Sequence, residues 1–273
     1  MQLAKNMKNS LYIVLFGLLM FSSCNEYQKA LKATDIGTKF KMGDSLFQAG
    51  KYTKANRLFE QIVPSYRGKP QAQKLMYMHA MSFYKTKDYY LSGYQFERFA
   101  KSYPQSEKLE EASFLSAKSK YMLSPTYTKD QQETRAAIEQ LQLFINDYSE
   151  SEYIVEANKL VQELDFKLEK KAFEIAKQYN TIYDYQASIK AFDNFLIEYP
   201  GSKLREEAMY YRLHSATELA INSVPWKKEE RLNNAKGYYE GFKKTFPDSG
   251  HIAEVDKMII KLDEELIAYN TKS

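Results

Sequence analysis

Apolar and polar positions alternate along this chain with the period of an α-helix, and one such pattern occurs five times. Each occurrence has a small residue at position 0 and large apolar residues at positions +4, +7 and +11, which lie on one helix face. The five sets are Ala55, Phe59, Ile62, Tyr66; Ser92, Phe96, Phe99, Tyr103; Ala137, Leu141, Phe144, Tyr148; Ser188, Phe192, Phe195, Tyr199; and Ala235, Tyr239, Phe242, Phe246. The pattern predicts five amphipathic helices that bury this face, with Phe192, Phe195 and Tyr199 among the buried residues.

A short polar segment follows the last aromatic residue of these helices. In three of them it is Pro-x-Ser, beginning at Pro104, Pro200 and Pro247, and in a fourth it is Ser-x-Ser. Proline ends a helix because it has no amide hydrogen and its ring clashes with the preceding turn. The serine two residues later is expected to accept a hydrogen bond from an amide where the next helix begins.

Shorter apolar stripes lie between these helices, so each repeat is predicted to be a helical hairpin. Residues 50–59 and 87–96 resemble the tetratricopeptide (TPR) signature at the turn into its second helix. The repeats recur every 37, 45, 51 and 47 residues, longer than the standard TPR of about 34 and close to HEAT repeats of about 40–47. The small residue and the terminal proline favour TPR. The predicted fold is all-α, a right-handed superhelical solenoid of about five stretched TPR hairpins.

Three segments account for the extra length. Residues 122–134 and 222–234 are predicted to be long connections inside repeats three and five, and Trp226 falls in the second of these. Residues 151–179 contain no Gly or Pro and predict one helix of about 29 residues that bridges two lobes. The expected lobes are residues 37–150, with repeats one to three, and residues 151–270, with repeats four and five and a closing helix.

The first 23 residues have the form of a signal peptide. Lys5 and Lys8 precede an apolar run at residues 11–21, which is too short to span a membrane, since a span needs about 20 residues. Two serines and then Cys24 follow, an arrangement that resembles a lipoprotein lipobox, although Phe21 stands where leucine is usual. We expect lipidation of Cys24, a linker at residues 24–36, and a periplasm-facing anchor. The alternative is a secreted protein with a free thiol.

Charge and composition argue against several function classes. Beyond the signal peptide there are 37 basic and 35 acidic residues, too even a balance to indicate nucleic-acid binding. The three histidines are far apart, and no metal-ligand spacing joins them. No catalytic motif or cofactor-binding loop is present. We therefore expect a non-enzymatic binding scaffold without a cofactor or metal, and Trp226 is a candidate contact residue.

The combination of a lipobox and about five stretched TPRs resembles the BamD family of lipoproteins, which belong to the outer-membrane β-barrel assembly machinery. Residues 130–153, with Arg135, resemble the third repeat of the family, and residues 183–202 resemble the fourth. The resemblance implies binding to the barrel-insertase subunit, to other subunits of the machinery, and to the C-terminal signals of unfolded barrel proteins. Relatives often carry an arginine in the fourth-repeat helix, where this chain offers only Lys190. Lys41 and Lys74 are candidates for binding a substrate carboxylate.

Two other readings stay open at this point. One is a different periplasmic TPR adaptor, such as the Tol–Pal coordinator proteins, which use similar Tyr-Pro-x-Ser repeats but usually add an N-terminal coiled coil. The other is a lipoprotein enzyme built on a helical toroid, such as a glycan-cleaving lyase or transglycosylase. That enzyme would need a catalytic carboxylate in a cleft, and the sequence offers no isolated candidate.

Overall fold

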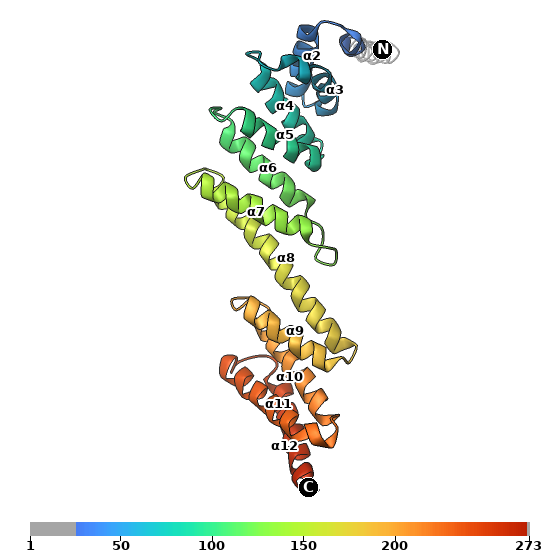
Figure 1. Ribbon diagram of the computed structural model, residues 1–273, viewed down its shortest axis with the longest axis vertical. Helices are drawn as coiled ribbons and strands as arrows, with labels where there is room; N and C mark the ends of the chain where they lie inside the picture. Colours follow the sequence, from blue (N-terminus) through green and yellow to red (C-terminus); the bar gives the residue numbers. More distant parts are fainter. Residues whose placement is uncertain (1–25, 272–273) are drawn as a thin grey trace, which may run out of the picture. The chain divides into compact units, whose positions relative to one another are not determined.

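The computed structural model describes residues 26–271, and every regular element among them is helical (Figure 1). Residues 26–32 form a short helical segment. The elements that follow are α2 (Ile36–Gln48), α3 (Tyr52–Ile62), η1 (Val63–Tyr66), α4 (Ala72–Lys85), α5 (Tyr89–Ser102), α6 (Leu109–Leu123), α7 (Gln132–Asp147), α8 (Ile154–Thr181), α9 (Tyr185–Glu198), α10 (Arg205–Ile221), α11 (Pro225–Thr245) and α12 (Ile252–Asn270). The predicted all-α, TPR-like class is confirmed.

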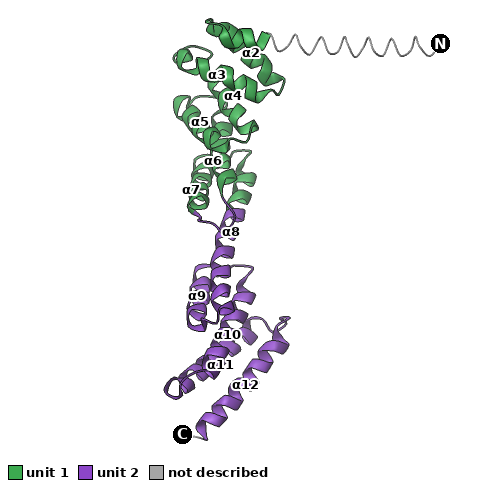
Figure 2. Ribbon diagram, turned by 90° about the vertical axis from the view of Figure 1, so that its right-hand side faces the viewer, with its two compact units in different colours: residues 1–124, 132–161 green, residues 125–131, 162–273 purple. Residues whose placement is uncertain are grey.

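The chain divides into two compact units (Figure 2). Unit 1 comprises the chain up to Ser124 together with residues 132–161. Unit 2 comprises residues 125–131 together with the chain after Val161. In unit 1 each helix from α2 to α7 packs against the next, and in unit 2 the same holds from α9 to α12. Such neighbour-to-neighbour packing is typical of stacked hairpins. The sequence had placed a lobe boundary at residue 150, whereas the units change inside α8.

The small residue at position 0 of each repeat is fully buried, as the pattern predicts. Ala55, Ser92, Ala137, Ser188 and Ala235 are all 0% exposed. Ser92 accepts a hydrogen bond from Ser119 at 3.0 Å, and Ser188 accepts one from Ser215 at 2.8 Å. Each donor lies 27 residues further on, in the first helix of the next repeat. Small side chains here allow adjacent helices to approach closely.

Aromatic side chains fill the space beside these small residues in an arrangement that two repeats share. The ring of Tyr77 meets Phe96 and Phe99 edge-on, with centroid distances of 5.9 and 5.7 Å. In unit 2, Phe173 meets Phe192 and Phe195 at 5.8 and 5.9 Å. Edge-to-face pairs of this kind add about 0.5–1.5 kcal/mol beyond burial alone.

The final aromatic residue of the fourth repeat, Tyr199, is less buried than expected. Phe192 and Phe195 are buried, but Tyr199 is half-buried, so that part of the prediction is wrong. Its ring packs on Phe195 at 5.3 Å, and its hydroxyl donates to the exposed Glu198. The polar end of tyrosine remains near solvent while its apolar body contributes to the core.

The serine after each helix end has the same role four times. Ser106, Ser151, Ser202 and Ser249 each accept a hydrogen bond through Oγ from the amide two residues later, at 3.0–3.4 Å. Their own amides donate to the carbonyl of the final aromatic residue three positions earlier. These serines close the turn just ahead of the next helix, as the sequence predicts.

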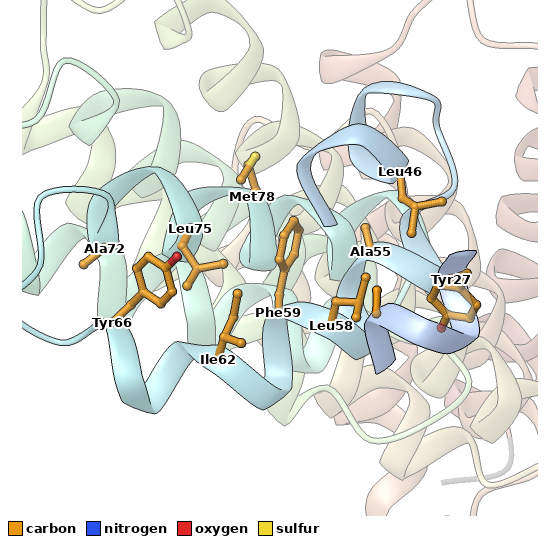
Figure 3. Close-up of a cluster of buried hydrophobic side chains, with 11 residues drawn as sticks. Tyr27, Leu46, Ala55, Leu58, Phe59, Ile62, Tyr66, Ala72, Leu75 and Met78 are labelled. Carbon is orange, nitrogen blue, oxygen red and sulfur yellow. The ribbon is translucent and has the colours of Figure 1, made fainter. Parts of the chain in front are cut away.

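Two segments differ from what the sequence indicated. Residues 26–32 were assigned to a linker, but they are helical, with Tyr27 and Ala30 buried in the core. Figure 3 shows Tyr27 in this cluster. The connection predicted at residues 222–234 is also shorter, because α11 begins at Pro225. Proline suits the first helical position, where its missing amide hydrogen costs nothing. Trp226 therefore lies on the first turn of a helix and not in a loop.

Gly43 should be intolerant of substitution because it faces the buried ring of Phe59. A Cβ built at Gly43 would lie 2.5 Å from Phe59 Cε1, and Phe59 is itself 0% exposed. We expect Gly43→Ala to lower the free energy of unfolding by about 1–3 kcal/mol through overpacking. Chemical denaturation monitored by circular dichroism measures this.

Gly237 is the matched control, since a Cβ there meets no atom within 4 Å. Gly237→Ala should raise the free energy of unfolding by about 0.5–1 kcal/mol, the cost of glycine inside a helix. A Gly43→Ala protein as stable as the wild type would show that the α2–α3 contact is not tight.

His79 should make unit 1 less stable in mild acid. It is 5% exposed, its Nδ1 donates to Asn56 Oδ1 at 2.6 Å, and burial together with the charge of Arg98 lowers its pKa from 6.5 to about 4. Between these values the unfolded chain binds a proton that the folded chain does not, so stability falls as pH drops from 6.5 to 4. The loss is at most about 3 kcal/mol.

The pH dependence of His79→Gln isolates this effect from the titrating carboxylates. Its unfolding free energy should fall less between pH 6.5 and 4 than that of the wild type. Parallel curves for the two proteins would contradict the assigned pKa of His79.

Candidate functional site

A hollow of about 440 Å³ in unit 1 brings two lysines beside aromatic walls. Its lining residues are Pro70, Gln73, Lys74, Tyr77, Phe99 and Lys108. We call it the Tyr77 hollow. It forms where the first turns of α4 and α6 meet α5, so the repeat packing itself determines its position. Gln73 Nε2 donates to Ser106 Oγ at 2.6 Å across this junction.

Both lysines of the Tyr77 hollow also have acidic partners. Lys74 pairs with Asp44 at 2.5 Å and still exposes 53% of its side chain. Lys108 pairs with Glu111 at 2.9 Å and exposes 55%, with its Nζ 5.6 Å from the Tyr77 ring centroid. Each ammonium group is therefore anchored but open to solvent, which leaves donors for a further anionic group.

The Tyr77 hydroxyl stays protonated at physiological pH. Burial raises its pKa, and the hydrogen bond to Glu111 adds to this effect. The pKa of Glu111 is lowered although burial opposes it, because Lys108 and Tyr77 both donate to the carboxylate. The hollow is thus lined by two lysines, each paired with a carboxylate, and by neutral aromatic side chains.

Of the two lysines named as candidates for a substrate carboxylate, Lys74 lines this hollow and Lys41 does not. Lys41 is exposed on α2 and is not among the lining residues. Lys108 is there instead, and the sequence reasoning missed it. Its position two residues after Ser106 could have indicated this placement, because the Lys108 amide donates to Ser106 Oγ in the turn where α6 begins.

A second groove, in unit 2, contains Lys190. It measures about 250 Å³ and is lined by Gln186, Ile189, Lys190, Asp193, Ala216, Leu219, Glu230, Arg231, Asn234 and Tyr238. We call it the Lys190 groove. Residues of α9 and α11 flank it, and α10 contributes Ala216 and Leu219. Its rim carries both charge signs around a small apolar floor.

An arginine missed at the sequence level supports this groove. Arg212, on α10, is 16% exposed; its Nη1 donates to Asp193 Oδ1 at 2.8 Å, and its guanidinium lies 4.2 Å from the ring centroid of Tyr238. Burial and the nearby Asp193 raise the pKa of Tyr238. The family resemblance implied an arginine on the fourth-repeat helix, where this chain has Lys190. Arg212 instead reaches the groove from α10, the next helix.

The other two candidate residues are exposed and lie apart from these hollows. Arg135 lies on the first turn of α7. A groove of about 310 Å³ between α5, α6 and α7 includes Gln140, Leu143 and Tyr148 but not Arg135. Trp226 is 77% exposed and lines neither the Tyr77 hollow nor the Lys190 groove. Cys24 lies outside the described residues.

Residues 26–271 contain no group of three or more His, Cys, Asp or Glu side chains placed to hold a metal ion. Within that stretch, no helix has both the length and the apolar content needed to cross a membrane.

Comparison with curated proteins finds two relatives by sequence. A putative outer membrane protein assembly factor BamD from Aquifex aeolicus is 28% identical over 220 residues, which cover 80% of this chain and 71% of the relative. The outer membrane protein assembly factor BamD from Pasteurella multocida is 20% identical over 208 residues, or 72% of this chain and 80% of the relative. Both confirm the resemblance found in the sequence.

Comparison with solved structures gives a match of low similarity. One from work on computationally designed, self-assembling cyclic homo-oligomers covers 94% of this chain at 12% identity, but its TM-score is 0.22. A family model also matches the chain. The model named YfiO, described as outer membrane lipoprotein, matches residues 33–190 and 168–272, nearly all of the described chain. The chain therefore belongs to the YfiO family of outer membrane lipoproteins.

Proposed function

We propose that this protein is a non-enzymatic, lipid-anchored scaffold that supports the assembly of β-barrel proteins in the outer membrane. The observation that carries this proposal is the family match across both units, joined by two relatives named as outer membrane protein assembly factors. The open hollows between helical hairpins suit noncovalent binding of protein segments, as repeat proteins generally do. No cofactor is needed for such a role.

The Tyr77 hollow is our candidate site for the C-terminal signal of an unfolded barrel protein. A chain terminus presents a carboxylate beside an apolar side chain. Lys74 and Lys108 supply partly exposed ammonium groups for the carboxylate, and Tyr77 and Phe99 supply the apolar wall. Each exposed ion pair contributes at most about 1 kcal/mol, so the lysines would select for a terminus more than they strengthen binding.

The Lys190 groove is our candidate contact for a folded partner, the periplasmic part of the barrel insertase. Asp193 and Arg231 line it with Lys190, while Arg212 holds Asp193 in place. Charges of both signs on a fixed framework favour one partner over others and specify its orientation. Arg135 and Trp226 are exposed and remain candidates for contacts with other subunits of the machinery.

Depletion of the protein in its native host, followed by outer-membrane proteomics, tests the function. We expect many barrel proteins to decline together and the insertase to copurify with the tagged wild-type protein from membranes. Copurification of Tol–Pal proteins or cell-wall enzymes instead, with barrel protein levels unchanged, would overturn the proposal and favour an envelope adaptor.

Measuring the affinity of purified variants for a barrel C-terminal peptide tests the Tyr77 hollow. Lys74→Met with Lys108→Met removes both charges but keeps the apolar stems, and Lys203→Met is the exposed control. The double variant should bind an apolar C-terminal barrel peptide about fivefold less tightly, matching about 1 kcal/mol. Equal affinity for the double variant and the control would exclude this hollow as the carboxylate site.

A further inference from the structure

The positive charge of the mature chain is concentrated at its N-terminal end. Residues 26–61 carry seven basic and four acidic side chains, whereas residues 62–273 carry 30 basic and 31 acidic ones. The whole excess thus lies in the segment nearest Cys24. A local charge excess beside a proposed acyl anchor can attract a membrane more strongly than the same charge spread over the whole surface. Salt screens charges that lie further from the membrane than about 8–10 Å.

The helical segment 26–32 is fixed to repeat one. Tyr27 is 6% exposed and Ala30 2% exposed, and both belong to the cluster that includes Ala55 and Leu58. Figure 3 shows Tyr27 beside these two residues. Lys54 Nζ lies 5.2 Å from the Tyr27 ring centroid. This segment is therefore part of unit 1 and not a free tether.

A second contact fixes the end of this segment. Lys39 Nζ donates to the carbonyl of Leu31 at 3.2 Å and also to Gln61 Oε1. These bonds link the segment to both α2 and α3. Its position relative to repeat one is therefore set by side chains from two helices as well as by the buried Tyr27.

Little chain separates the anchor residue from this rigid body. Glu26 is two residues after Cys24, and two residues span at most about 7 Å. An acyl group on Cys24 would therefore hold repeat one close to the lipid headgroups. With so short a connection, the exposed side chains around the segment would face those headgroups at close range.

Four exposed lysines lie at this end, together with the exposed Glu26. Lys29 and Lys32 lie three positions apart on the outer side of the segment, opposite the buried Tyr27 and Ala30. Lys51 immediately precedes α3, one turn before Lys54, which reaches the Tyr27 ring. We define these four lysines as the basic end of unit 1.

We propose that the basic end of unit 1 binds the headgroups of anionic phospholipids in the leaflet that holds the Cys24 anchor. The proposal rests on the lipidation of Cys24 in the proposed function. Lipid chains and a basic patch then act as two signals for one membrane, which is the usual requirement for stable attachment of a lipidated protein. Repeat one would lie on the membrane surface instead of hanging from a long linker.

Vesicle cosedimentation of the mature Cys24→Ala protein tests the headgroup contact without the anchor. We expect more binding to vesicles of phosphatidylglycerol and phosphatidylethanolamine than to phosphatidylcholine vesicles, and weaker binding as salt rises. Lys29→Glu, Lys32→Glu and Lys51→Glu together should reduce binding to the anionic vesicles at least tenfold, because each lysine near an anionic surface adds to the free energy of membrane binding. Lys54 is left intact because it packs on Tyr27.

A charge-matched variant and a folding check make the result specific. Lys203→Glu, Lys227→Glu and Lys257→Glu change three exposed lysines of unit 2 by the same total charge. This control should bind the anionic vesicles almost as well as the parent, and thermal melts should show that both triple variants fold. Equal loss in both variants, or no preference for anionic lipid, would overturn the proposal.

A cellular experiment separates this inference from the anchor on which it rests. Full-length protein with Cys24→Ala should leave the membrane fraction if Cys24 is lipidated. If it leaves while the lysine variant binds vesicles normally, the anchor stands and the headgroup contact is overturned. Crosslinking in the same cells covers a protein partner. If the triple lysine variant loses a crosslink to an acidic protein while its vesicle binding is unchanged, the headgroup contact is also overturned and the lysines are assigned to that protein.

Discussion

The close approach of helices at one small residue per repeat is the constraint on which this structure depends. Ala55, Ser92, Ala137, Ser188 and Ala235 have no exposed surface. A larger residue at any of these positions would push the next hairpin away and separate the aromatic rings packed beside it. In repeats two and four the contact also includes a serine–serine hydrogen bond, so the hydroxyls are satisfied where they are buried.

The candidate binding surfaces follow from the same contact. Tyr77 packs edge-on against Phe96 and Phe99 in the core, and its other edge lines the hollow that contains Lys74 and Lys108. In unit 2, Arg212 crosses from α10 to Asp193 on α9 and Tyr238 on α11, and so joins three helices beside the Lys190 groove. Both candidate sites therefore lie at junctions between repeats, where rigid packing positions a few charged side chains.

Much of the fold could be predicted because helix-period burial and the Pro-x-Ser segment are local signals. The sequence could not show that Lys87 and Tyr183 adopt φ of 63° and 67°, the left-handed turn that Gly50 adopts with φ of 71° in the first repeat. Nor could the sequence show that Lys74 and Lys108 line one hollow, or that Arg212 pairs with Asp193. Both arrangements depend on how neighbouring hairpins stack. The helix at residues 26–32 was missed because only Tyr27 and Ala30 are buried, too few for a periodic pattern.

The proposed function assigns two different partners to two different junctions between repeats. Site-specific photocrosslinking in living cells tests this most directly, with a photoreactive residue at Gln73 in the Tyr77 hollow, at Gln186 in the Lys190 groove, and at exposed Gln178 on α8 as a control. We expect crosslinks to unfolded barrel proteins at Gln73, to the barrel insertase at Gln186, and to neither at Gln178, with the products identified by mass spectrometry. The same partners at all three positions, or Tol–Pal proteins at Gln73 and Gln186, would contradict the proposed function.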